Sequence, residues 1–119
     1  MAPDSRYRVS ALLGFAAVAL GAFGAHGLKS VLIQYNTGAI WETAVLYHLT
    51  HAIVLVVIAR SEACHRWSWL FFVAGITIFS GSLYVLALSN LRWLGAVTPI
   101  GGICLLLGWF SLALWPSRR

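Results

Sequence analysis

The sequence has few charged residues, and acidic residues are the scarcest of them. Only 9% of its 119 residues are charged, against about 25% in a typical soluble domain. Aspartate and glutamate together number three, and none lies in the middle of an apolar run. A di-metal carboxylate bundle and a Ser-His-Asp triad are therefore excluded, because both need acidic residues inside the fold. A proton-coupled exporter with a membrane-embedded carboxylate is excluded for the same reason.

Cysteine is also rare. Cys64 lies in a polar connection and Cys104 inside an apolar run, so no disulfide is predicted, and no C-x-x-C pair is present for a quinone-linked thiol oxidase. Cys64 and His65 could contact a metal ion, but one such pair is more simply a loop without metal, and we predict no metal site. The basic residues come in ones and twos between the apolar runs and form no basic patch interleaved with aromatic residues, so nucleic acid is not a predicted partner.

Hydrophobic residues make up 61% of the chain and gather in four long runs, at about 9–25, 39–59, 67–88 and 93–115. Each run approaches or exceeds the ~20 residues that an α-helix needs to cross a bilayer. The length of the chain leaves room for one domain. The sequence therefore predicts an all-α, integral membrane four-helix bundle, with residues 1–119 forming a single membrane domain and the lipid bilayer as a partner.

The first run also has the basic start and small-residue end of a secretory signal peptide. It is longer than a usual signal core, which favours a retained first helix. The connection after it carries apolar residues at helical spacing, namely Leu28, Val31, Leu32 and Tyr35. This spacing predicts a short helix at the membrane interface, with Asn36 or Thr37 capping the next helix.

The basic residues of the connections predict the orientation. The N-terminus, the second connection and the C-terminus hold Arg6, Arg8, Arg60, Arg66, Arg118 and Arg119, whereas the first and third connections hold Lys29 and Arg92. Both termini are therefore predicted to face the cytoplasm of a bacterial inner (plasma) membrane. Aromatic residues are expected at the interfaces, with Tyr7, Trp67, Trp69 and Trp115 on the inner side and Trp41 and Trp93 on the outer side.

Small residues form stripes on the first and fourth runs. The stripes are Gly14, Ala17, Gly21 and Ala25, and Gly101, Cys104, Gly108 and Ser111. Small residues let helix backbones approach closely, so both stripes are predicted to face another helix. Because these faces exceed what one four-helix unit must bury, we expect a homo-oligomer or a larger membrane complex.

Polar residues inside the runs form the candidate site. Two histidines and a tyrosine lie near the middle of the second run, where ionisable side chains are costly. At 1.5 Å per residue, hydroxyl groups of the third and fourth runs fall near the same depth. The candidate polar core or ligand-binding site is His26, Tyr47, His48, His51, Thr77, Ser80, Tyr84 and Thr98. Pro99 is expected to free a backbone carbonyl at a similar level.

Helical angles divide the second run into two faces. The inward face holds Trp41, Ala44, Tyr47, His48 and His51, and the lipid face holds Leu46, Leu49, Ile53 and Val56. A buried histidine without a charged partner stays neutral. We therefore expect His51 to hydrogen-bond a hydroxyl or a backbone carbonyl, with Ser80 and Tyr84 as its nearest polar neighbours.

Two functions fit this polar core. In the simpler one its groups bond to each other and fix helix packing, and the chain is a structural or accessory membrane subunit. The alternative is a binding protein for a lipid, quinone or haem. His48 and His51 lie one turn apart on one helix and cannot ligate opposite faces of one iron, so haem would need a second helix or subunit. No catalytic residue is predicted, an enzyme is the least favoured class, and the sequence identifies no cofactor.

Several motifs resemble those of a small membrane family. They are GAFGAHGL (21–28), TAVLYH (43–48) with HA (51–52), FSGSLY (79–84), TPIGG (98–102) and GW (108–109). In order and spacing they are similar to the family called domain of unknown function 423, whose animal relatives are called transmembrane protein 256. The resemblance covers nearly the whole chain and implies a four-helix membrane protein without an established activity. His26 and His51 match the family pattern, whereas many relatives have glutamine at His48, which weakens any mechanism that needs two histidines.

Overall fold

The structure, a computed structural model, describes residues 3–61 and 65–114, and within them all regular secondary structure is helical. The elements are α1 (Pro3–Ala25), α2 (Lys29–Tyr35), α3 (Gly38–Arg60), α4 (Arg66–Ser89), the 3-10 helix η1 (Arg92–Ala96) and α5 (Thr98–Leu114). Four segments of the described chain are long and apolar enough to cross a membrane: α1, α3, α4 and the continuous stretch of η1 with α5. The predicted all-α four-helix membrane fold is confirmed.

The predicted boundaries hold best in the middle of the chain, where α3 and α4 begin and end within one residue of the expected runs. α1 begins at Pro3, so Arg6 and Arg8 belong to its first turns rather than to a segment before it. Proline suits the first position of a helix because its missing N–H would have no partner there. The expected end of the fourth run at Trp115 lies outside the described residues, as do Cys64, Arg118 and Arg119.

The fourth span consists of a 3-10 helix followed by an α-helix rather than of one α-helix. η1 ends at Ala96, and α5 begins at Thr98 with Pro99 as its second residue. Backbone N–H groups of a first helical turn have no intrahelical partner, so proline there removes no helix hydrogen bond. The expectation that Pro99 frees a carbonyl in the middle of a helix is therefore wrong, because this proline begins a helix instead of interrupting one.

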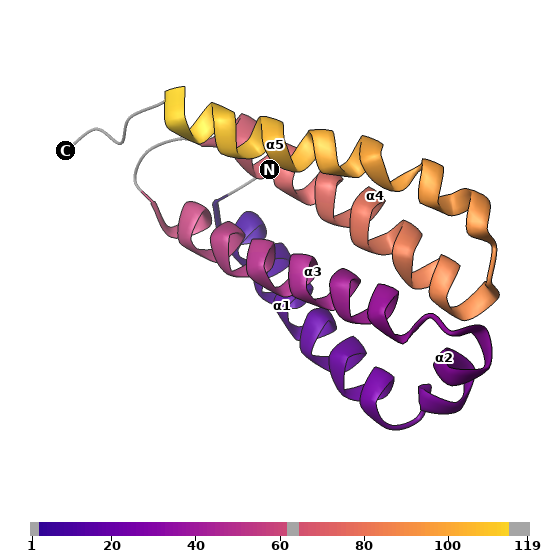
Figure 1. Ribbon diagram of the computed structural model, residues 1–119. Helices are drawn as coiled ribbons and strands as arrows, with labels where there is room; N and C mark the ends of the chain where they lie inside the picture. The colour runs from indigo at the N-terminus through magenta and orange to yellow at the C-terminus, as the bar shows by residue number, and fades with distance from the viewer. Residues whose placement is uncertain (1–2, 62–64, 115–119) are drawn as a thin grey trace.

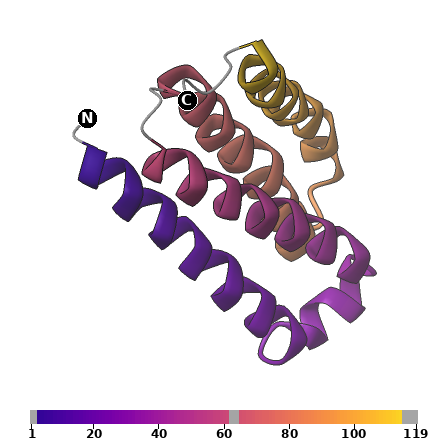
Figure 2. The same ribbon diagram turned by 90° about the vertical axis from the view of Figure 1, so that its left-hand side faces the viewer.

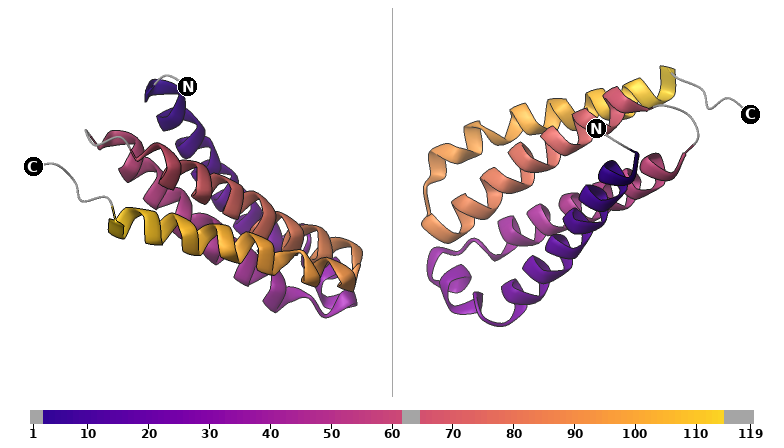
Figure 3. Two further views of the ribbon diagram at one scale, coloured as in Figure 1. Left: turned by 90° about the horizontal axis from the view of Figure 1, so that it is seen from above. Right: turned by 180° about the vertical axis from the view of Figure 1, so that it is seen from behind.

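The four long segments lie side by side in the order α1, α3, α4, α5, as Figure 2 shows. Within the described residues each helix backbone packs only on its neighbours in this row, so α1 and α5 are its edges. The start of α1 and the end of α5 lie at one end of the molecule, and α2 and η1 at the other (Figure 1). α1 crosses the other three obliquely (Figure 3).

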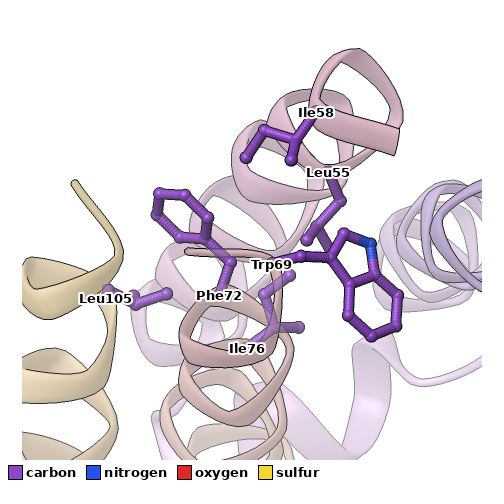
Figure 4. Close-up of a cluster of buried hydrophobic side chains, with 6 residues drawn as sticks. All are labelled: Leu55, Ile58, Trp69, Phe72, Ile76 and Leu105. Carbon is purple, nitrogen blue, oxygen red and sulfur yellow. The ribbon is translucent and has the colours of Figure 1, made fainter. Parts of the chain in front are cut away.

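A hydrophobic cluster joins α3, α4 and α5 in the half of the molecule away from α2. It consists of Leu55, Ile58, Trp69, Phe72, Ile76 and Leu105 (Figure 4). Val9 and Leu13 of α1 pack against it. Lipid tails are as apolar as these side chains, so the cluster stabilises the fold through close packing rather than through removal from water.

The two small-residue stripes account for how closely the helices approach. On α1, Ala17 is fully buried, and a Cβ added to Gly21 would lie 3.2 Å from Val45 of α3. On α5, a Cβ at Gly101 would overlap the backbone of Phe79, and one at Gly108 would lie 2.7 Å from the ring of Phe72. Both stripes thus face a helix of the same chain, as predicted, except that Ala25 is exposed. Because they are used inside one chain, they no longer argue for an oligomer.

The short helix predicted in the first connection is present as α2, and side-chain contacts fix its position. Leu32 packs with Trp41 and Ala87. Thr37 directly precedes α3, but its hydroxyl caps no α3 amide. The hydroxyl donates instead to the carbonyl oxygen of Ala87 over 2.7 Å, in the last turn of α4, where carbonyls lack intrahelical partners. Together these contacts hold α2 against the ends of α3 and α4.

Candidate polar site on α3

His51 is buried on α3, and both of its ring nitrogens have partners. Trp109 of α5 donates its indole N–H to Nε2 of His51 over 3.1 Å. Because an indole N–H can only donate, Nε2 must accept, and the proton of a neutral ring sits on Nδ1. Nδ1 then donates to the carbonyl oxygen of Tyr47, 2.7 Å away. The geometry assigns His51 as a neutral imidazole with its proton on Nδ1.

The expectation that His51 bonds a backbone carbonyl is confirmed, but its expected neighbours are wrong. Ser80 donates to the carbonyl oxygen of Ala44 over 2.8 Å. Tyr84 lies 2.8 Å from Nδ1 of His48. The partner that the sequence did not reveal for His51 is Trp109. His48 and His51 therefore connect α3 to two different helices, His48 to α4 and His51 to α5.

His48 is less completely partnered than His51. Its side chain is 4% exposed, and its Nδ1 shares a hydrogen bond with the Tyr84 hydroxyl. Its Nε2 is buried without a hydrogen-bond partner within the described residues. Either tautomer leaves one nitrogen unpaired, since the tyrosine hydroxyl engages only Nδ1.

Further polar links between helices lie nearer the ends of the molecule. The links are Trp69 to Ser10 (2.9 Å) and Ser68 to Ser111 (2.6 Å) at one end, and Ser82 to Thr98 (2.7 Å) and Trp41 to the carbonyl of Leu20 (3.0 Å) towards the other. Polar contacts are thus spread along the length of the row. The polar groups that were predicted to cluster at one depth instead form separate pairs at several positions along the row.

Three of the predicted site residues lie apart from the histidines. His26 is exposed in the turn after α1, and Thr77 is exposed and donates to Val73 of its own helix. Thr98 at the start of α5 pairs with Ser82. Tyr47 belongs to the site through its carbonyl and through its ring, which stacks on His51 with centroids 6.0 Å apart, although the residue is 41% exposed.

Two of the tryptophans expected at the membrane interfaces are buried inside the protein. Trp41 and Trp69, expected at the membrane interfaces, are each 3% exposed and donate hydrogen bonds inside the protein. Trp67 and Trp93 are largely exposed, in agreement with an interfacial position. One signal for Trp41 was present, because its helical angle already placed it on the inward face of the second run with His48.

The chemistry open to the site is limited. Within the described parts of the chain, no three histidine, cysteine or acidic side chains come close enough together to hold a metal ion. The two nitrogens of His51 are occupied by Tyr47 and Trp109. The arrangement therefore provides neutral hydrogen bonds that hold α3, α4 and α5 at a fixed rotation.

Four apolar spans joined by polar pairs define a multi-pass helical membrane protein. The chain belongs to the family described as protein of unknown function (DUF423), which matches residues 20–102. This membership confirms the family resemblance of the motifs.

Curated relatives cover nearly the whole chain. It is 44% identical over 111 residues to a UPF0382 membrane protein of Staphylococcus epidermidis, with 89% of each chain covered. It is 40% identical to the UPF0382 membrane protein YwdK of Bacillus subtilis, over 89% of this chain and 88% of the relative. It is 42% identical to the UPF0382 inner membrane protein YgdD of Escherichia coli K12, over 92% and 86%. No solved structure shows a significant match.

Proposed function

We propose that this chain is a non-catalytic structural or accessory subunit of a bacterial inner membrane, and that its polar core serves helix packing. The observation that carries the proposal is the closed environment of His51, whose two nitrogens are both bonded within the chain. A residue that binds substrate or metal needs a free donor or acceptor aimed at a cavity. The groove of about 800 Å³ between α1, α2 and α3 is not lined by His48 or His51.

An accessory role also needs a surface for another protein. Within the described residues, the row arrangement leaves α1 and α5 each in backbone contact with one long helix. Large side chains of α5, including Leu106 and Phe110, are more than half exposed. We infer that a second copy or a larger membrane complex packs on these edge helices.

The proposal predicts that the purified protein carries no chromophore. It also predicts that mild detergent extracts the protein as part of an assembly. After mild extraction, the visible spectrum is expected to show no haem band, and native mass spectrometry to show the chain bound to itself or to other membrane proteins. A haem band, or a stoichiometric quinone, that disappears in His48→Ala but persists in His26→Ala would contradict the proposal. His26→Ala is the matched control because His26 is exposed in the turn after α1 and takes no part in the hydrogen bonds of His48 and His51.

We further propose that both termini face the cytoplasm. One end of the molecule holds the start of α1, the end of α3 and the start of α4. The basic residues at this end are Arg6, Arg8, Arg60 and Arg66, whereas those at the opposite end are Lys29 and Arg92. The bias favours this end as cytoplasmic.

Single cysteines at two positions test the orientation. In a chain whose Cys64 and Cys104 are replaced by serine, an impermeant thiol reagent added to intact cells should label Ser30→Cys on α2 and leave Ser5→Cys on α1 unlabelled. Cell lysis should expose Ser5→Cys to the reagent. The reverse pattern in intact cells would show that the chain is inserted the other way round.

A further inference from the structure

The groove between α1, α2 and α3 is separate from the hydrogen bonds of His48 and His51. It has a volume of about 800 Å³, which lies within the range of small-molecule sites. One wall is the end of α1 with Gly21 and Gly24, and the opposite wall is the first three turns of α3. α2 closes the end with Lys29 and Ile33.

The walls of the groove are held in place by contacts that the structure describes. A side chain at Gly24 would overlap Trp41, so glycine allows the indole to lie against α1. There its N–H donates to the carbonyl oxygen of Leu20 over 3.0 Å. α2 is fixed through Leu32 and through Arg92, which donates to the carbonyl oxygen of Tyr35 over 2.9 Å. The groove is therefore a formed feature of the fold.

The groove changes from polar to apolar along α3. Lys29 and Glu42 line its outer part, and Val45, Leu46 and Leu49 line the part nearer the middle of the molecule. From Gly38 to Leu49 the helix rises about 16 Å at 1.5 Å per residue. One leaflet of the hydrocarbon core is about 15 Å deep. The groove is thus about as deep as one leaflet, and like a leaflet it is polar at its outer end and apolar towards the middle.

The two charges at the polar end have no partner among the residues that the structure describes. Within the described residues, neither the ammonium of Lys29 nor the carboxylate of Glu42 forms a hydrogen bond or an ion pair, and they do not pair with each other. Glu42 is one of only three acidic residues in the chain. Glu42 is exposed about one turn into α3, at the polar end of the groove, so a cationic group of a bound ligand can reach its carboxylate.

We propose that the groove binds one phospholipid whose headgroup carries a phosphate and a primary amine, as in phosphatidylethanolamine. The phosphate contacts Lys29, the amine donates to Glu42, and an acyl chain lies along Val45, Leu46 and Leu49. A primary ammonium can donate charge-assisted hydrogen bonds to a carboxylate, whereas a choline group has no N–H to donate and a glycerol headgroup has no positive charge. Glu42 therefore selects the amine, and Lys29 attracts any phospholipid.

Lipid titrations of the purified protein by native mass spectrometry test this selectivity. Ethanolamine, choline and glycerol phospholipids with the same acyl chains should bind in that order of preference. Glu42→Gln should weaken ethanolamine lipid binding about fivefold, the effect of one charge near a membrane surface, and remove its advantage over choline lipid. Lys29→Gln should weaken all three similarly. Asp4→Asn, at an exposed acid outside the groove, is the control. Unchanged ethanolamine lipid binding in Glu42→Gln would overturn the proposal.

A photoreactive amino acid distinguishes the occupants of the groove. Leu46 and Leu106 are similarly exposed, at 63% and 69%, but only Leu46 lines the groove. A photoreactive residue at 46 should form an adduct with ethanolamine phospholipid that falls in Glu42→Gln, whereas one at 106 should label bulk lipids without preference. An adduct at 46 with a second copy of the chain, or the same lipid mixture at both positions, would contradict the proposal. Equal melting temperatures of the variants would confirm that the fold is intact.

Discussion

Replacement of Gly101 by alanine is expected to destabilise the protein by about 2–4 kcal/mol, whereas the same change at the adjacent Gly102 is expected to be neutral or stabilising. A Cβ at Gly101 would overlap the backbone of Phe79, which cannot move aside as a side chain could. Overpacking of this kind typically costs about 1–3 kcal/mol and occasionally more. At Gly102 the nearest atom is in the ring of Phe79, 3.9 Å away, which is an ordinary contact.

The two variants form a matched pair because the glycines lie next to each other in α5 and each substitution adds one methyl group. In an open helical position, alanine is favoured over glycine by about 0.5–1 kcal/mol. Thermal unfolding of each purified variant in the same detergent measures the difference. If both variants melted at the temperature of the unchanged chain, α4 and α5 would not pack as closely as the structure shows.

The spans could be predicted because a bilayer requires long apolar runs, and the limits of α3 and α4 were predicted within one residue. α1 was predicted too short, because hydropathy detects only the apolar part of a helix and the polar turn containing Arg6 and Arg8 continues beyond it. The division between η1 and α5 was missed because Gly95 and Pro99 lie in an otherwise apolar run.

Hydrogen-bond partners could not be predicted in the same way. Helical angles correctly placed His48 and His51 on the inward face of α3. Three residues of a helix turn the direction of a side chain by about 300°, so the two rings point about 60° apart. That difference sends His48 towards Tyr84 of α4 and His51 towards Trp109 of α5. The outcome depends on the order and crossing of the helices, which a single sequence does not specify.

The spread of polar pairs along the row has a physical reason. Apolar packing gives little preference for one helix rotation over another in a lipid environment, whereas a buried donor without a partner is costly. Pairs near both ends and in the middle fix the rotation of each helix along its length. Trp69 with Ser10 connects α1 to α4, and His51 with Trp109 connects α3 to α5. Both pairs connect helices that are not direct neighbours in the row.

Replacement of His51 by alanine is expected to lower the free energy of unfolding by about 2–4 kcal/mol. The change removes two hydrogen bonds, leaves the indole N–H of Trp109 without its acceptor, and empties a space beside the rings of Phe72 and Trp109. His26→Ala removes the same ring from an exposed turn and should change stability by less than about 0.5 kcal/mol. Unfolding of the two purified variants in one detergent measures this contrast.

A double-mutant cycle isolates the link between α3 and α5. Trp109→Phe keeps an aromatic ring but removes the N–H donor. The coupling between His51→Ala and Trp109→Phe should be about 0.6 kcal/mol and no more than about 1.7 kcal/mol, the average and the maximum found for hydrogen bonds between membrane helices. Additive effects of the two changes would show that the contact contributes nothing beyond packing.

The tautomer of His51 provides a test that does not depend on stability. The indole of Trp109 can only donate, so the imidazole proton must reside on Nδ1. Nitrogen NMR of labelled protein should therefore show a neutral His51 protonated at Nδ1. In Trp109→Phe the constraint on Nε2 is absent, and the Nε2-protonated form should become populated. A proton on Nε2 in the unchanged chain would contradict the Trp109 hydrogen bond, and with it the closed environment on which the proposed non-catalytic role rests.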